Sequence, residues 1–456
     1  MQDGQSSGFI FILVHLQRTI IMRKIILSLA TIILMVGIAA AQATTPPLTV
    51  AKPESVAVSS ERLKRLDAFI QKHVDDGQLN GSSMMIIRDG KIVYHKAFGH
   101  TDTEKKTAMR TDHLFRIASM TKPIVSVAVM MLCEEGKFAL DDPISNHIPE
   151  FSNAQVIATY NASDTSYTTT PARSNITIRH LLSHTSGIGY AQIGTPEAKA
   201  IYYKNGVNGG IGTPYSTLKM MIPKLAKLPL FHQPGEKYLY GLNTDVLGYL
   251  VEVASGMPLD RFMQERIFAP LGMKDTYFFL PTDKHPRLVP LYRQDNDGML
   301  RHQDSVISLN GDFHRDFPKT RGGTYFSGGA GLTSTAMDYA IFCQMMLNGG
   351  TYNGTRILSP HSIRMMTSNQ IGNISMGGNP DAPNRFGLGF GVYTEKSEAI
   401  YPVHAGSYDW GGMFATNFWI DPEARLACVF MRNIWPLRNP EIGNRLKTMV
   451  YQALND

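Results

Sequence analysis

Matching strand patterns at the two ends of the chain constrain the fold more than any other feature. Near the N-terminus, residues 83–88 and 91–98 flank Asp89-Gly90, a dipeptide that tight two-residue hairpins prefer. Near the C-terminus lie three further strand-like runs, at residues 390–394, 414–420 and 426–431. We therefore expect one antiparallel sheet that both ends of the chain build together.

Apolar spacing also predicts a helix at each end. Ser59 can cap the first helix, which ends near Gly77. The second helix opens at Asn439-Pro440 and carries its apolar residues on one side: Ile442, Leu446, Met449, Val450 and Ala453. Because helices and sheets are stable only when they bury a face against another layer, the pattern predicts an α+β fold. It would be an α/β sandwich whose antiparallel sheet is flanked by the terminal helices.

The middle of the chain has a different pattern. Helical periodicity alternates there with loops rich in Gly, Pro, Asn and Ser, and it is strongest at residues 125–133, 244–254 and 336–347. We interpret this stretch as an all-helical, or mainly helical, insertion. The predicted order is residues 44–117 and 385–456 for the two parts of the sheet domain, with the insertion at 118–384.

Residues 1–43 have the pattern of a leader. Met22-Arg23-Lys24 supplies a basic start, an apolar run follows, and residues 39–43 provide small residues of the A-x-A type. The apolar run is shorter than the roughly 20 residues that a membrane-spanning helix needs. We expect a signal peptide that starts at Met22, a mature chain that is periplasmic or secreted, and no stable membrane span after cleavage.

Composition argues against several classes of partner. The chain has 44 Lys and Arg against 38 Asp and Glu, a net charge of +6, and the two signs are interspersed. This pattern disfavours nucleic acid as a partner. Three cysteines in 456 residues cannot form a disulfide framework. No glycine loop of the phosphate-binding type is present, and no cofactor is expected.

Ser119 is the candidate nucleophile. It precedes a strongly apolar segment that stops at Gly136, which places Ser119 at a helix start with Lys122 on the same face. A serine hydroxyl is a poor nucleophile until a base takes its proton, and a lysine amine or a lysine-activated tyrosine can do so. On spacing alone, Ser119 is explained equally well as a helix cap, because chance S-x-x-K matches are expected in a long chain.

Other motifs favour no competing chemistry. Residues 216–219 repeat the S-x-x-K spacing, but Pro223 breaks the run that follows. The G-x-S-x-G elbow of α/β-hydrolases occurs only at residues 4–8, with no strand before it. His180 and His184 have the spacing of a zinc pair but lack the H-E-x-x-H glutamate, which predicts packing or turn-capping roles and no metal site.

Further boxes follow Ser119 in order. Tyr240 lies in a loop before a helix, within the run 234–248, and residues 410–413 (Trp-Gly-Gly-Met) begin a late strand with small residues. With residues 181–187 and 329–332, these boxes resemble the serine β-lactamase-like family. That family includes class C β-lactamases, D,D-peptidases and family VIII carboxylesterases, and the resemblance covers most of the chain after the leader.

The resemblance implies an active site in the cleft between the sheet domain and the helical insertion. It makes Ser119 the acylated nucleophile and Lys122 its activating base or proton relay. Tyr240 would pass the proton to the leaving atom.

The resemblance also implies an oxyanion hole on the backbone. One donor would be the amide of Ser119. The other would be that of Met413 if Trp410 opens the third box, or that of Ser407 if His404 opens it. The esterase-like span from Trp410 onwards favours Met413.

Two departures separate this chain from the β-lactamases. These enzymes carry an asparagine two residues after the tyrosine, where this chain has Leu242, and Asn243 comes one place later. They also carry a lysine on the late strand that pairs with the drug carboxylate, and this chain lacks it. The candidate pocket residues are Trp410, Gly411, Gly412, Leu242 and, as an alternative carboxylate partner, His404.

The sequence therefore predicts an exported serine hydrolase that forms an acyl-enzyme on Ser119 and hydrolyses small carboxylic esters. One alternative is a β-lactamase or D,D-peptidase that acts on amide bonds. An alternative from another class is a non-catalytic relative that binds a ligand or peptidoglycan.

Ser119→Ala should lower turnover by several powers of ten, on the order of the 10⁶ lost when a hydrolase loses its serine. Ester hydrolysis by the purified chain measures the effect, and Lys122→Ala should come close to it. Ser216→Ala is the control, since Ser216 has the same S-x-x-K spacing. An inactive Ser216→Ala beside an active Ser119→Ala would contradict the assignment.

Overall fold

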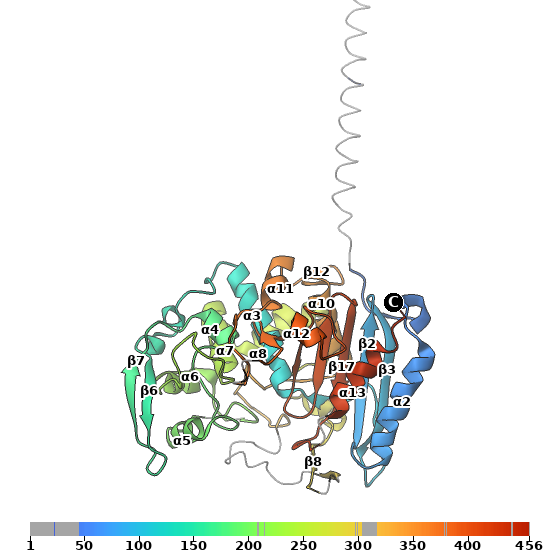
Figure 1. Ribbon diagram of the computed structural model, residues 1–456, viewed down its shortest axis with the longest axis horizontal. Helices are drawn as coiled ribbons and strands as arrows, with labels where there is room; N and C mark the ends of the chain where they lie inside the picture. Colours follow the sequence, from blue (N-terminus) through green and yellow to red (C-terminus); the bar gives the residue numbers. More distant parts are fainter. Residues whose placement is uncertain are drawn as a thin grey trace, which may run out of the picture. The chain divides into compact units, whose positions relative to one another are not determined.

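An antiparallel sheet made from both ends of the chain forms the centre of the computed structural model (Figure 1). The structure describes Met22 and residues 45–207, 209–213, 215–296, 298, 300–302, 317–377, 379, 381–438 and 441–455. Residues 47–456 form one compact unit. The leader prediction for residues 1–43 and the helix start at Asn439-Pro440 lie outside the described residues, apart from Met22. No described helix has both the length and the apolar character needed to cross a bilayer.

In the described residues the sheet has nine strands, and all of its pairs are antiparallel except β1 with β3. The order across it is β1 (Thr49–Val50), β3 (Lys91–Asp102), β2 (Gly81–Arg88), β17 (Leu426–Met431), β16 (Asn417–Asp421), β15 (Tyr408–Gly411), β14 (Gly391–Val392) and β13 (Arg385–Phe386), with β4 (Thr107–Ala108) beside β3. The central pair, β2 with β17, joins the two ends of the chain. The predicted antiparallel sheet is confirmed.

The predicted hairpin forms at Asp89-Gly90. Arg88 pairs with Lys91, and both turn residues have positive φ, 52° for Asp89 and 70° for Gly90. Two consecutive positive φ angles define the turn whose twist matches that of the flanking strands, and they explain why Asp-Gly is preferred.

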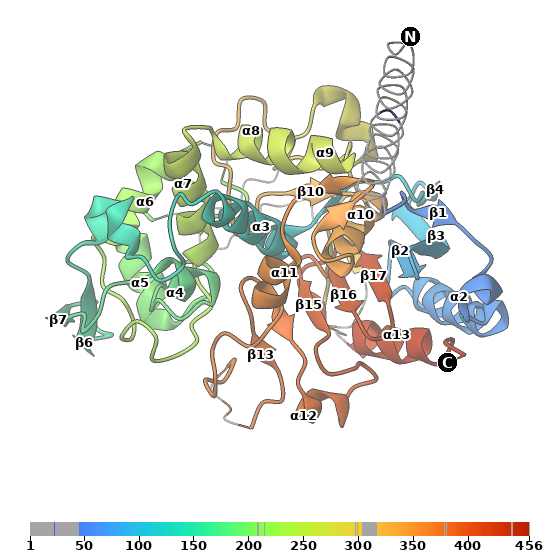
Figure 2. The ribbon, with the colours of Figure 1, turned by 90° about the horizontal axis from the view of Figure 1, so that it is seen from above.

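Alternate residues of the central strands face two different apolar layers. On β17, Leu426, Cys428 and Phe430 pack with the terminal helices α2 (Ser60–Asp75) and α13 (Glu441–Tyr451). The residues between them, Ala427, Val429 and Met431, join the larger core on the other face. This two-residue alternation follows from strand geometry and leaves the sheet buried on both sides. Figure 2 shows α2 and α13 together along the sheet.

Most of the remaining elements lie between β4 and β13 in sequence; η1 (Pro53–Val56) precedes β4 and α12 (Glu395–Glu398) follows β14. The helices between β4 and β13 are α3 (Thr121–Glu134), α4 (Ile178–Leu182), α5 (Pro196–Lys204), α6 (Leu218–Ala226), α7 (Asn243–Ser255), α8 (Leu259–Met263), α9 (Ala269–Leu271), α10 (Ala336–Leu347) and α11 (Pro360–Met366). Short strand pairs are β5 (Phe115–Arg116) with β10 (Thr333–Ser334), β6 (Gln155–Tyr160) with β7 (Tyr167–Pro171), β8 (Tyr292–Gln294) with β9 (Leu300–His302), and β11 (Thr351–Tyr352) with β12 (Thr355–Arg356). Single turns of other helix types are η1 (Pro53–Val56), η2 (Ala118–Met120), η3 (Ile144–Asn146), η4 (Pro149–Phe151), η5 (Gln264–Phe268) and η6 (Thr282–Arg287).

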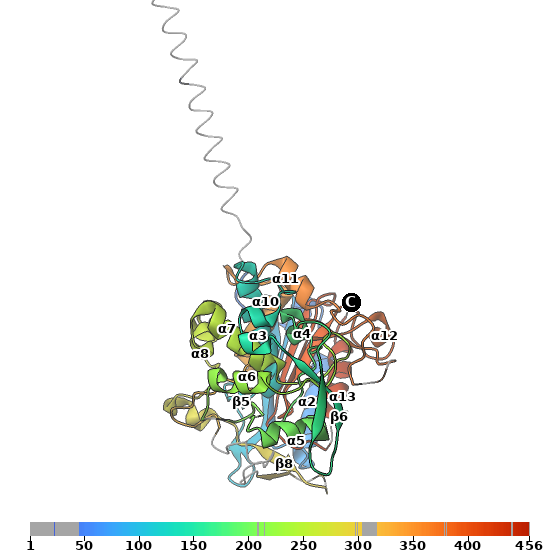
Figure 3. The same cartoon turned by 90° about the vertical axis from the view of Figure 1, so that its left-hand side faces the viewer.

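Most of these helices gather beyond one side of the sheet. Figures 1 and 2 show α4 to α7 and the β6–β7 hairpin far from α2 and α13, and Figure 3 views them end-on. Helix α10 differs, because it packs against β2 and β17. The segment predicted as a helical insertion therefore also supplies a helix that covers the sheet.

Two strands differ from the sequence prediction. The run 414–420 becomes a strand only from Asn417, because residues 412–416 turn the chain between β15 and β16. Strand β15 precedes this turn, so Trp410 lies near the end of a strand rather than at its beginning. Its sequence, Tyr-Asp-Trp-Gly, lacks the apolar run that signals a buried strand.

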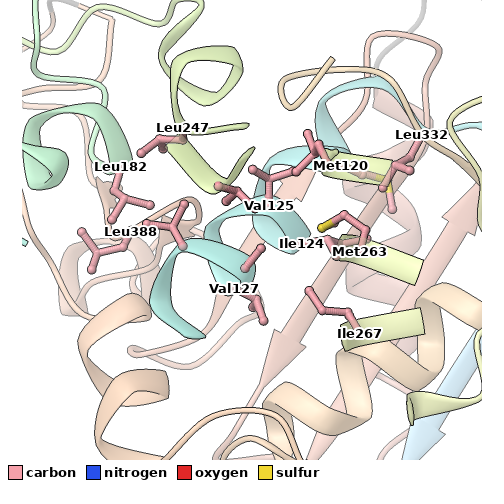
Figure 4. Close-up of a cluster of buried hydrophobic side chains, with 14 of the residues drawn as sticks. Met120, Ile124, Val125, Val127, Leu182, Leu247, Met263, Ile267, Leu332 and Leu388 are labelled. Carbon is pink, nitrogen blue, oxygen red and sulfur yellow. The ribbon is translucent and has the colours of Figure 1, made fainter. Parts of the chain in front are cut away.

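Helix α3 carries the nucleophile segment into the core. All of its residues from Thr121 to Leu132 are buried, and Figure 4 shows Val125 and Val127 among side chains from α4, α7 and the 386–391 turn. Pro123 is tolerated because it lies in the first turn, where the backbone N–H groups have no partner within the helix.

Gly389→Ala should destabilise the protein more than Gly90→Ala. Both glycines have positive φ, so alanine at either position adds backbone strain of about 1 kcal/mol or more. A Cβ at Gly90 meets nothing within 4 Å, whereas one at Gly389 would lie 2.3 Å from Ser126 Oγ on α3. Urea denaturation of both variants should show an additional loss of about 1–3 kcal/mol for Gly389→Ala. Equal losses would mean that α3 shifts freely.

Candidate active site

Ser119 lies on the one-turn helix η2 at the entrance to α3. Ala118, just before it, has a φ of 41°, a left-handed conformation that non-glycine residues rarely adopt. Neighbouring segments hold this turn, because Ile117 N donates to Leu332 O (3.0 Å) and Tyr339 OH donates to Met120 O (2.9 Å). The strained turn directs the Ser119 side chain toward Lys122.

Lys122 is fully buried and makes three hydrogen bonds. Its Nζ donates to Ser119 Oγ (3.3 Å), Tyr190 OH (3.0 Å) and Gly329 O (2.7 Å). An ammonium group has three donors, so every one has an acceptor. The Nζ also lies 4.5 Å from the ring centre of Tyr240, within the range of a cation–π contact.

The Tyr190 hydroxyl accepts a hydrogen bond from Lys122, whereas the Tyr240 hydroxyl has another partner. It accepts a hydrogen bond from Trp410 Nε1 (3.4 Å), and the two rings lie 5.6 Å apart. Tyr190 packs against Tyr240 with ring centres 5.5 Å apart. Burial, together with the neighbouring Tyr240 and Asp245, raises the pKa of Tyr190. The site thus holds two tyrosines around one lysine.

Tyr190 is the site residue that sequence reasoning did not single out. It comes three residues after the 181–187 box, which was used only as part of the family pattern. A tyrosine in a glycine-rich loop carries no local signal for contact with a lysine 68 positions earlier. Only the position of the loop brings the two together.

Two loops place both tyrosines at Lys122. Leu239 N donates to His184 O (2.8 Å) and Leu242 N donates to Gly189 O (3.1 Å), so residues 184–189 and 239–242 run together. A Cβ at Gly241 would lie 1.9 Å from Ile188 O, which explains glycine at that position.

The histidines and the neighbouring polar residues support these loops. His180 and Thr177 cap α4, while buried His184 receives a hydrogen bond from Asn243 Nδ2 (2.9 Å). Burial and nearby Lys122 hold the pKa of His184 well below its usual value. Asn243 therefore supports the loop, and Leu242, 1% exposed, packs in the main core, so its role as a pocket residue stays a prediction. In the described residues no group of three or more His, Cys, Asp or Glu side chains could hold a metal ion.

The Trp410 box lies against the Ser119 turn. A Cβ at Gly412 would be 2.3 Å from Ile117 O, and the side chain of Met413 packs on the cluster that contains Ala118. Residues 412–416 form the turn that follows Trp410, and Gly412 N closes it by donating to Thr416 O (2.7 Å). Trp410 and Gly411 therefore lie beside the candidate nucleophile.

The structure does not bring His404 and Ser407 to this place. His404 Nδ1 pairs with Asp421 Oδ2 (2.7 Å), at the end of β16 opposite the Trp410–Gly411 end of the hairpin. Ser407 N already donates to His404 O (3.1 Å). Strand pairing thus brings the Trp410–Gly411 end of the hairpin to the Ser119 turn and His404 to the opposite end, which favours Trp410 as the residue that opens the third box.

Tyr240→Phe should lower turnover about 10²–10⁴-fold without loss of folding, because it removes a hydroxyl that can carry a proton. Tyr238→Phe is the matched control. Among the described residues the buried Tyr238 hydroxyl has no hydrogen-bond partner, so its removal should leave both activity and stability essentially unchanged. Turnover of Tyr240→Phe within a few-fold of wild type would contradict the role of Tyr240, and Tyr190→Phe would then test the other hydroxyl.

Comparisons with known proteins agree with this geometry. The family model described as Beta-lactamase matches residues 66–449. Protein Rv1367c of Mycobacterium tuberculosis (strain ATCC 25618 / H37Rv) is 35% identical over 378 residues, which cover 80% of this chain and 88% of that protein. Esterase EstB of Burkholderia gladioli is 32% identical over 380 residues, covering 81% and 90%. The solved structure of EstCE1, described as a hydrolase with promiscuous acyltransferase activity, matches with a TM-score of 0.72 and 28% identity over 86% of this chain and 98% of that one. The chain therefore belongs to the Beta-lactamase family of serine hydrolases.

Proposed function

We propose that this chain is an exported carboxylesterase that forms an acyl-enzyme on Ser119. The observation that carries the proposal is the contact of buried Lys122 Nζ with both Ser119 Oγ and a tyrosine hydroxyl. This arrangement links the nucleophile to groups that can accept and return its proton. The similarity to an esterase from Burkholderia gladioli supports it, and export rests on the leader pattern of residues 1–43.

The proposed reaction has two steps. Ser119 Oγ attacks the ester carbonyl, its proton passes through the Lys122 and tyrosine cluster, and Tyr240 returns a proton to the departing alcohol. Water then attacks the acyl-serine, and the reverse proton path frees Ser119 and the carboxylic acid. The amides of Ser119 and Met413 would stabilise the oxyanion in both steps.

The surroundings favour uncharged acyl or alkoxy groups. Trp410 lies beside Tyr240. On this late strand the β-lactamases of the resembling class carry a lysine. His404, the alternative carboxylate partner from the sequence, is held by Asp421 at the other end of the hairpin. A substrate carboxylate buried against the rings of Trp410 and Tyr240 with no cation beside it would cost several kcal/mol.

A rate comparison tests the proposal. We expect kcat/KM for a short p-nitrophenyl ester to exceed that for a chromogenic cephalosporin by at least about 10²-fold, or roughly 2.7 kcal/mol of transition-state preference. Ser119→Ala should abolish both activities. Comparable or reversed rates would favour a β-lactamase or D,D-peptidase. No turnover and no labelling by a fluorophosphonate would favour a non-catalytic binding protein.

A further inference from the structure

A buried carboxylate beside the site has no role in the proposed reaction. Asp245 is the third residue of α7 and is fully buried. Its Oδ1 accepts hydrogen bonds from Ser327 Oγ (2.8 Å) and Tyr325 OH (3.3 Å), while its Oδ2 lies against the backbone of Gly329, whose N–H faces the carboxylate, and has no side-chain donor among the described residues. A buried, partly unsatisfied carboxylate is costly, and such groups concentrate at functional sites.

Gly329 separates Oδ2 of Asp245 from Lys122. A Cβ placed on Gly329 would lie 2.5 Å from Asp245 Oδ2, 3.0 Å from Tyr190 OH and 3.5 Å from Lys122 Nζ. These distances limit the separation of the two charged groups to about 6 Å. Only a residue without a side chain can occupy this position, and its carbonyl is also an acceptor for Lys122.

Asp245 is the carboxylate that the structure places near Lys122. None of the ion pairs among the described residues involves it, and its three hydrogen-bond acceptors are two hydroxyls and a carbonyl. A buried ammonium needs an opposite charge in a medium of low dielectric constant. The groups that face Asp245 are Lys122 from α3, Tyr190 from its loop, and Tyr325 and Ser327 from the loop before β10.

We propose that Asp245 is a positioning residue whose ionised carboxylate is the counter-ion of Lys122 and holds the Lys122 amine group in place for the proton transfers at Ser119. This inference rests on the proposed acylation of Ser119. No bond to Asp245 forms or breaks. Its charge acts through Lys122, while the proton of Ser119 passes through the Lys122 and tyrosine cluster to the leaving group.

Burial raises the pKa of Asp245 to about 6, and the hydrogen bonds from Ser327 and Tyr325 and the charge of Lys122 oppose this rise. The carboxyl is therefore neutral below about pH 6 and charged above it. Acylation of Ser119 should be fast above this pH and should slow as the pH falls through it, because Lys122 then loses its counter-ion.

The test measures the rate of Ser119 labelling by a fluorophosphonate between pH 5 and 8, by intact mass. It requires no knowledge of the natural substrate. The labelling rate of the wild type should fall as the pH drops through about 6, which gives the pH profile an acidic limb. Asp245→Asn keeps the size of the side chain and an acceptor for Ser327 and Tyr325 but is neutral at every pH. Its rate should be about 10-fold or more below the wild-type plateau and should show no such limb.

Asp338→Asn is the matched control. Asp338 is also buried, on α10, and burial raises its pKa to about 6 as well, but its partners are Asp275 N and Thr276 Oγ1. The acidic limb should persist in this variant. Ser327→Ala is the second variant, in case Asp245→Asn fails to fold. Ser327→Ala removes a hydrogen bond that lowers the pKa of Asp245, so the acidic limb of the labelling rate should move to higher pH.

The outcomes separate the two proposals. An unchanged limb in Asp245→Asn, or one that is lost in Asp338→Asn instead, would overturn the role of Asp245 and leave acylation of Ser119 intact. An unmoved limb in Ser327→Ala would do the same. Absence of labelling in wild type would overturn the proposed function itself, and the counter-ion role with it.

Discussion

The buried ammonium of Lys122 is the interaction on which the site depends. A fully buried cation is stable only when the protein supplies acceptors and an opposite charge, and here four segments do so. The η2 turn brings Ser119, the 188–191 loop brings Tyr190, and the segment 327–331 brings the carbonyl of Gly329. Helix α7 adds Asp245.

Several glycines make this convergence possible. Gly329 lies between Lys122, Tyr190 and Asp245, Gly241 lies against Ile188 O, and Gly412 lies against Ile117 O. At each position a side chain would overlap atoms of a neighbouring segment. The boxes that identify the family are therefore places where backbones approach one another closely, and the reactive groups are set between them.

The sequence predicted the elements whose pattern is local. The Asp89-Gly90 hairpin, helix α10 and strand β17 are confirmed, because turn chemistry and apolar periodicity are properties of neighbouring residues. The antiparallel fold and the family are likewise confirmed. Strand β15 was missed, since its Tyr-Asp-Trp-Gly sequence is defined by its neighbours in the sheet. The roles of Ser119, Lys122 and Tyr240 stay predictions, although the structure brings all three together.

By itself, the sequence determined the type of fold, the candidate Ser119 and Lys122 pair three residues apart, and the order of the boxes along the chain. These features need only local geometry, because one helical turn brings residues i and i+3 to the same face. Tertiary structure alone decided that Tyr190 and Asp245 surround Lys122 and that the Trp410 turn, rather than His404, lies beside Ser119. Those residues are separated by many positions, and their proximity depends on how loops and strands pack.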